Sequence, residues 1–72
     1  MAIYIEDDLH AERVGDFATA EEALTRLKQL ESLDAQALAA EIGPTPCQNP
    51  HCRRELQVVV GGRVIARAPP SS

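Results

Sequence analysis

Residues 56–67, Leu-Gln-Val-Val-Val-Gly-Gly-Arg-Val-Ile-Ala-Arg, decide the fold of this chain. Two runs rich in β-branched residues flank the pair Gly61-Gly62, and such runs are typical of strands. A two-residue glycine turn is typical of a tight β-hairpin, because both turn positions can then adopt a positive φ. The stretch therefore predicts two antiparallel strands joined by a tight turn.

A second, weaker hairpin is predicted at the N-terminal end. Ile3 and Ile5 alternate with polar neighbours, and the period of two indicates a short strand with one buried face. Asp7-Asp8 suits a turn, and residues 11–17 show a poorer alternation after it. Gly15 interrupts this second run, which suggests a β-bulge or a close approach of two backbones.

The middle of the chain predicts two helices. Thr19 followed by Glu22 has the spacing of a capping box, so a helix begins there. Asp34 can cap a second, shorter helix, which Gly43-Pro44 then ends. One continuous helix over residues 20–42 is the alternative, since nothing between the two halves forbids it sterically.

The predicted order of elements is β-β-α-α-β-β. It corresponds to an α+β class: a small two-layer domain in which two β-hairpins form an antiparallel sheet with two helices on one face. We expect one domain over residues 1–68 and a disordered tail over residues 69–72. The core should be thin, because the chain has only 72 residues and eleven of them are alanines.

Charge limits the partners that this chain can bind. The formal net charge of −4 argues against nucleic acid and anionic membranes, which bind basic surfaces. Residues 1–42 hold ten acidic and three basic residues, whereas residues 43–72 hold one acidic and four basic residues. This asymmetry is compatible with two solvated faces or with electrostatic complementarity between partners. No apolar run is long enough to span a membrane, and no leader pattern follows Met1, so we expect a cytoplasmic protein.

Cys47, His51 and Cys52 form the clearest candidate for chemistry. With His10, they make up all the cysteines and histidines of the chain, enough for one Cys₂His₂ zinc site. A Cys47–Cys52 disulfide is a second possibility, and two unpaired thiols that pack as small apolar groups are the third, which we favour. No cofactor is therefore expected, with zinc as the alternative.

Four arginines near the second predicted hairpin are candidates for partner binding. If the glycine turn is tight, Arg63 lies opposite Val60 and Arg67 lies opposite Leu56 or its neighbour. Both arginines would then share one face of the strand and, with Arg53 and Arg54, could form a basic strip for an acidic partner. An ordinary solvated sheet face is the alternative.

These observations favour binding over catalysis. No Ser-His-Asp, Walker or glycine-rich phosphate motif occurs in the sequence. A thin core and terminal hairpins with open sheet edges predict a homodimer or an accessory domain of another protein, and not an enzyme. The alternative hypothesis is a zinc-binding or thiol redox protein centred on Cys47, His51 and Cys52.

Overall fold

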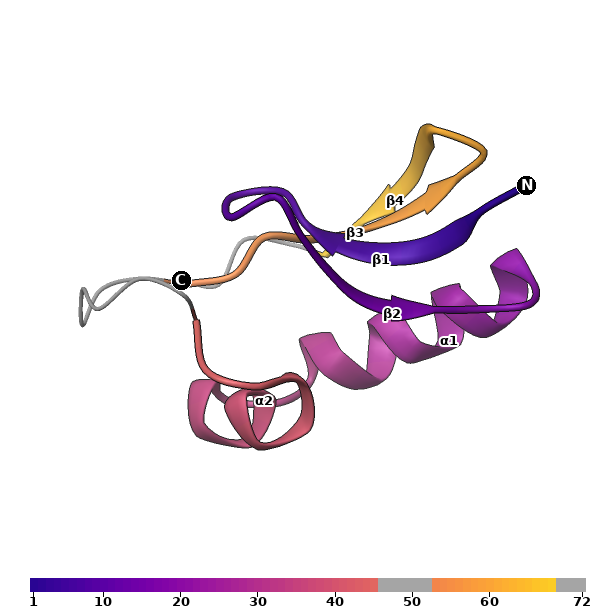
Figure 1. Ribbon diagram of the computed structural model, residues 1–72. Helices are drawn as coiled ribbons and strands as arrows, with labels where there is room; N and C mark the ends of the chain where they lie inside the picture. Colours follow the sequence, from indigo (N-terminus) through magenta and orange to yellow (C-terminus); the bar gives the residue numbers. More distant parts are fainter. Residues whose placement is uncertain (46–52, 69–72) are drawn as a thin grey trace.

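The computed structural model describes residues 1–45 and 53–68, and within them it confirms the predicted α+β class. Segment 46–52 and the predicted tail at 69–72 lie outside the described residues. The elements follow the predicted order (Figure 1). Their bounds are β1 Ile3–Asp7, β2 Glu12–Asp16, α1 Ala20–Glu31, α2 Ala35–Ile42, β3 Leu56–Val60 and β4 Arg63–Arg67.

The four described strands form one antiparallel sheet in the order β2-β1-β3-β4. Strands β1 and β3 lie at its centre, although more than forty residues separate them along the chain. Strands β2 and β4 are its edges. The two predicted hairpins therefore form, and they join through the β1–β3 pair, in which Ile5 lies opposite Val58.

Two helices form where the capping residues predict them. The Thr19 hydroxyl accepts a hydrogen bond from the Glu22 backbone N–H at 3.1 Å, and Asp34 accepts one from the Ala37 N–H at 2.8 Å. Gly43 follows α2 with a φ of 89°, a value that L-residues rarely adopt, and so ends the helix. The choice of two helices over one continuous helix is confirmed.

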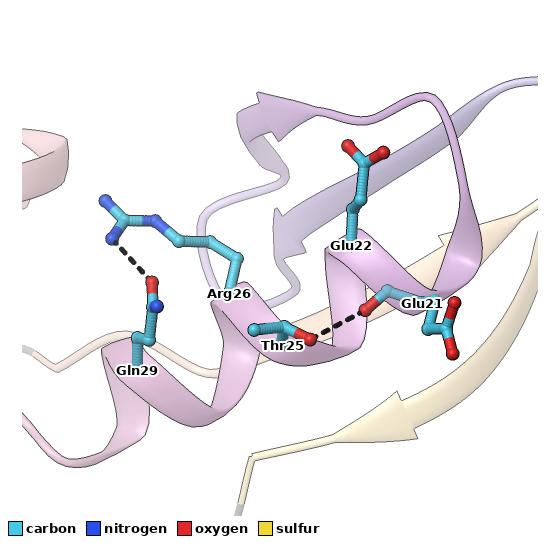
Figure 2. Close-up of a pocket in the computed structure, with 5 residues that line it drawn as sticks. All are labelled: Glu21, Glu22, Thr25, Arg26 and Gln29. Carbon is cyan, nitrogen blue, oxygen red and sulfur yellow. Dashed lines mark hydrogen bonds between the residues drawn. The ribbon is translucent and has the colours of Figure 1, made fainter.

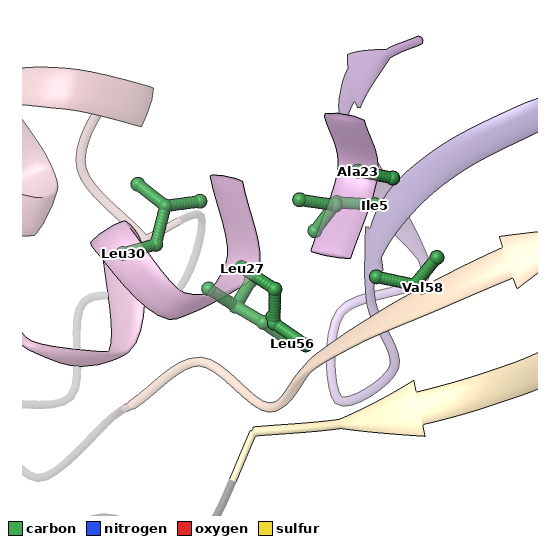
Figure 3. Packing of buried hydrophobic residues seen from close by; sticks show 6 residues of the cluster. All are labelled: Ile5, Ala23, Leu27, Leu30, Leu56 and Val58. Carbon is green, nitrogen blue, oxygen red and sulfur yellow. The ribbon is translucent and has the colours of Figure 1, made fainter. Parts of the chain in front are cut away.

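Helix α1 lies against one face of the sheet (Figure 1), and the buried core side chains lie between them (Figure 3). Helix α2 lies on the same side of the sheet, beyond the C-terminal end of α1, and it contributes no fully buried residue. Among the described residues, the core is thin, as expected. Its buried members are Ile5, Ala23, Leu27, Leu30, Leu56 and Val58.

Each hairpin contains one β-bulge. In the first hairpin, the register shifts so that Val14 has no partner on β1. Val14 is the neighbour of Gly15, where the sequence suggested a bulge. In the second, Ile65 is the extra residue between Val64 and Ala66. A bulge changes which face the following side chains occupy, and that change decides where the β4 arginines lie.

None of the described helices is both long enough and apolar enough to cross a membrane.

Candidate functional site

The Arg54 side chain makes four hydrogen bonds that link separate parts of the described structure. Arg54 precedes β3, and its side chain is only 2% exposed. One terminal nitrogen, Nη1, lies 3.1 Å from Asp7 Oδ2 and 3.3 Å from Glu12 Oε2. The other, Nη2, donates to the backbone carbonyls of Gly43 at 3.2 Å and Pro44 at 2.9 Å. One guanidinium therefore joins the end of β1, the start of β2 and the segment after α2.

Asp7 is the anionic centre of this cluster and is fully buried. As the last residue of β1, it turns the chain locally: its Oδ1 accepts hydrogen bonds from the N–H groups of Leu9 and Glu55, each at 3.1 Å. Its Oδ2 lies 2.6 Å from His10 Nδ1 as well as beside Arg54. We call Asp7, His10, Glu12 and Arg54 the Asp7 cluster.

The environment of Asp7 lowers its pKa. Burial alone raises the pKa, because it disfavours the charged form. The hydrogen bonds from His10 and from the Glu55 N–H act in the opposite direction, as do the nearby charges of His10 and Arg54. The result is a pKa below the ordinary aspartate value, so Asp7 is ionised at neutral pH.

The sequence holds a signal for a buried carboxylate at Asp7. Ile3, Ile5 and Asp7 follow one another at a period of two, so Asp7 is in phase with the buried face of β1. A carboxylate in such a position requires hydrogen bonds and a positive partner. Which arginine supplies the charge depends on the tertiary fold, since Arg54 lies 47 residues away along the chain.

The predicted metal site is only partly covered by the structure. Cys47, His51 and Cys52 lie outside the described residues, so their arrangement stays a prediction. His10 lies in the Asp7 cluster. Arg54 of the same cluster binds the Pro44 carbonyl, just before segment 46–52, and follows that segment in the sequence by two residues. In residues 1–45 and 53–68, no three His, Cys, Asp or Glu side chains are arranged to hold a metal ion.

The four predicted partner-binding arginines do not form one strip. Arg54 is buried in the Asp7 cluster, whereas Arg53, Arg63 and Arg67 are exposed. The predicted pairing is correct, with Arg63 opposite Val60 and Arg67 opposite the neighbour of Leu56.

The prediction that Arg63 and Arg67 share one face is wrong, because of the bulge at Ile65. Their partners on β3, Val60 and Gln57, are three residues apart and so point to opposite faces. Arg63 therefore lies on the helix-covered face of the sheet. Arg67 lies on the other face, with its Nη1 4.0 Å from Asp8 Oδ2.

Strand β4 also exposes apolar side chains. Val64 is 37% exposed and Ile65 is 44% exposed, and they are neighbours at the middle of an edge strand. Strand β2, the other edge, has none of the exposed large apolar residues found in the described part of the chain. The two edges therefore differ in what they can bind.

A shallow hollow lies along the outer side of α1 and is lined by one helix face (Figure 2). Its cation, Arg26, donates to Gln29 Oε1 at 3.3 Å and to Glu41 Oε1 at 3.0 Å. The second contact joins α1 to α2. Because these bonds hold the two helices together, we assign Arg26 a structural role.

Removing the Arg54 side chain should strongly destabilise the fold. In Arg54→Ala, the buried Asp7 carboxylate loses its permanent positive partner, and a broken buried ion pair typically costs about 3–5 kcal/mol. Urea denaturation measures the free energy of unfolding. Arg53→Ala is the matched control, since its exposed side chain should contribute within about 0.5 kcal/mol. Equal unfolding free energies for the two variants would contradict this assignment.

Acid should weaken the fold through Asp7. Because the pKa of Asp7 is lower in the folded than in the unfolded chain, its contribution to stability is fully present above the unfolded value of about 3.8. The contribution is lost as the pH falls through the lower folded value. The difference in unfolding free energy between wild type and Asp7→Asn should therefore shrink between pH 7 and pH 3. A difference that stays constant over this range would exclude a lowered pKa at Asp7, and the exposed Asp16→Asn provides the control.

Comparisons of this chain with models of known protein families, with curated proteins and with solved structures found no match.

Proposed function

We propose that this chain is a small protein-interaction domain that acts by binding and not by catalysis, and that it associates with a second copy of itself. The observation that carries the proposal is the exposed apolar pair Val64 and Ile65 on edge strand β4. An edge strand also offers unpaired backbone N–H and C=O groups to another strand. Together these features are the usual requirements for a strand-mediated protein contact.

The small core supports self-association. Six buried apolar residues form the described core cluster, and α2 adds no fully buried residue to it. Domains of this size bury a smaller fraction of their unfolded-chain surface than larger domains do, so additional apolar burial has a large effect on their stability. A second copy would supply that burial, and it would stabilise the folded state by mass action.

The bonds of the buried charges support a structural and not a catalytic role for the Asp7 cluster. Each Asp7 oxygen and each Arg54 terminal nitrogen has at least two polar contacts within the chain. A catalytic carboxylate or cation needs contact with the substrate. The net charge of −4 further favours a protein partner over nucleic acid.

Sedimentation equilibrium tests the proposed homodimer. At micromolar concentrations, the mass should be about twice 7.8 kDa, and the melting temperature should rise with protein concentration. A 7.8 kDa species at every concentration, with a constant melting temperature, would refute self-association.

A zinc-binding protein is the second candidate function, and one observation favours it. Asp7 Oδ2 lies 2.6 Å from His10 Nδ1, and metal-ligating histidines commonly have a carboxylate behind the ring in this way. The same cluster is bonded to the backbone just before segment 46–52, which contains Cys47, His51 and Cys52. Zinc, if bound there, would contribute to folding.

Metal analysis of the native protein tests this second candidate. The zinc hypothesis predicts about one zinc per chain or per dimer, a lower melting temperature after chelation, and loss of zinc in His10→Ala. The exposed Leu9→Ala, one residue earlier in the same turn, is the control and should retain the metal. Zinc-free native protein whose melting temperature is unchanged by a chelator would eliminate the zinc hypothesis.

A further inference from the structure

We infer that two copies associate through an antiparallel β4–β4 pair, which joins their four-stranded sheets into one continuous sheet of eight strands. This inference rests on the proposed homodimer and identifies its interface. A two-fold axis perpendicular to the sheet relates the copies, so the two α1 helices cover the same face. Two-fold contacts of this kind are the commonest in homo-oligomers.

The composition of the two edges selects β4 over β2. On β2, the Glu12 carboxylate is bound to Arg54, and Arg13 is paired with Asp16 at 3.2 Å. On β4, Val64 and Ile65 are exposed, and apolar side chains that meet across a strand pair stabilise it. A β4–β4 pair therefore buries exposed apolar surface, whereas a β2–β2 pair brings charged side chains together.

The faces of the sheet and the charge of Arg63 together select the register of the new pair. Arg63 and Ala66 both lie on the helix-covered face, because their β3 partners Val60 and Val58 do. Residues opposite each other in an antiparallel pair point to the same face, which permits Arg63 of one copy to pair either with Arg63 or with Ala66 of the other. The first register places two like charges directly opposite each other, which is destabilising, so we assign the second. Val64 and Ile65 then lie at the two-fold axis and meet the same two residues of the second copy.

Charge is compatible with this arrangement. The bulge at Ile65 places Arg63 and Arg67 on opposite faces, so neither arginine lies directly opposite the other across the axis. Strands β3 and β4 contain no carboxylate. The ten acidic residues of segment 1–42 therefore lie outside the two strands of this hairpin. Joining the copies at β4 leaves both β2 strands, which carry Glu12 and Asp16, at the two outer edges of the eight-stranded sheet. Contact through β4 therefore limits repulsion between two acidic chains.

The interface is tested by placing a charge at the two-fold axis. Val64→Glu and Ile65→Glu should each raise the dimer dissociation constant at least tenfold, because each buries two like charges close together. Leu24→Glu is the matched control: Leu24 is also 37% exposed but lies on α1, so its dimer should be unchanged. Circular dichroism of each monomeric variant shows whether the fold is retained.

Amide hydrogen exchange on the wild-type protein gives a second readout that needs no substitution. Raising the protein concentration through the dimer transition should slow exchange at β4 and leave the β2 edge unchanged. If the protein is a dimer but Val64→Glu behaves like wild type, or protection appears at β2, the β4 interface is wrong and the proposed homodimer stands. If wild type is a monomer throughout, both are wrong.

Discussion

The buried ion pair between Arg54 and Asp7 is the contact on which the rest of this structure depends. Arg54 also binds Glu12 and the carbonyls of Gly43 and Pro44, so one side chain connects β1, β2 and the end of α2 to the start of β3. Burying two charges costs several kcal/mol of desolvation, which only good geometry and further hydrogen bonds offset. The contacts of Asp7 with Arg54 and with the Glu55 N–H link the end of β1 to the residues that precede β3, and the β1–β3 pairing places the core.

The same pair separates the arginines by role. Arg54, although next to Arg53 in the sequence, is taken into the interior because the buried face of β1 ends in Asp7. The exposed cations that remain near the second hairpin include Arg63 and Arg67, which lie at the two ends of β4. Of the four arginines that were candidates for partner binding, Arg54 is a buried structural residue. The other three are at the surface, and only these three are accessible to a partner.

Short sequence patterns predicted the helices, the strands and their hairpins. They did not predict the β-bulge at Ile65 or the long-range pairing of Asp7 with Arg54. The glycine turn at Gly61-Gly62 and the caps Thr19 and Asp34 act within a few residues, so sequence alone reveals them. The bulge at Ile65 shifts the β3–β4 register by one residue, so Arg63 and Arg67 point to opposite faces of the sheet. The residues that they pair with on β3 were predicted correctly. The partner of Asp7 depends on which segments meet in space, which periodicity does not encode. Of the predicted metal set, His10 alone has a described environment.

Strand β4 combines features that oppose aggregation with features that permit one specific contact. Charged residues at the strand ends and a bulge at its centre both hinder the addition of arbitrary strands. The apolar pair Val64 and Ile65 lies between these charged ends. A strand that pairs with β4 must therefore carry apolar side chains at its centre and have no cation directly opposite Arg63. In the proposed dimer, a second copy of β4 fulfils both conditions, since it presents Ala66 to Arg63 and the same apolar pair at the axis. The bulge that separates the arginines would then also make the edge complementary to a second copy of itself.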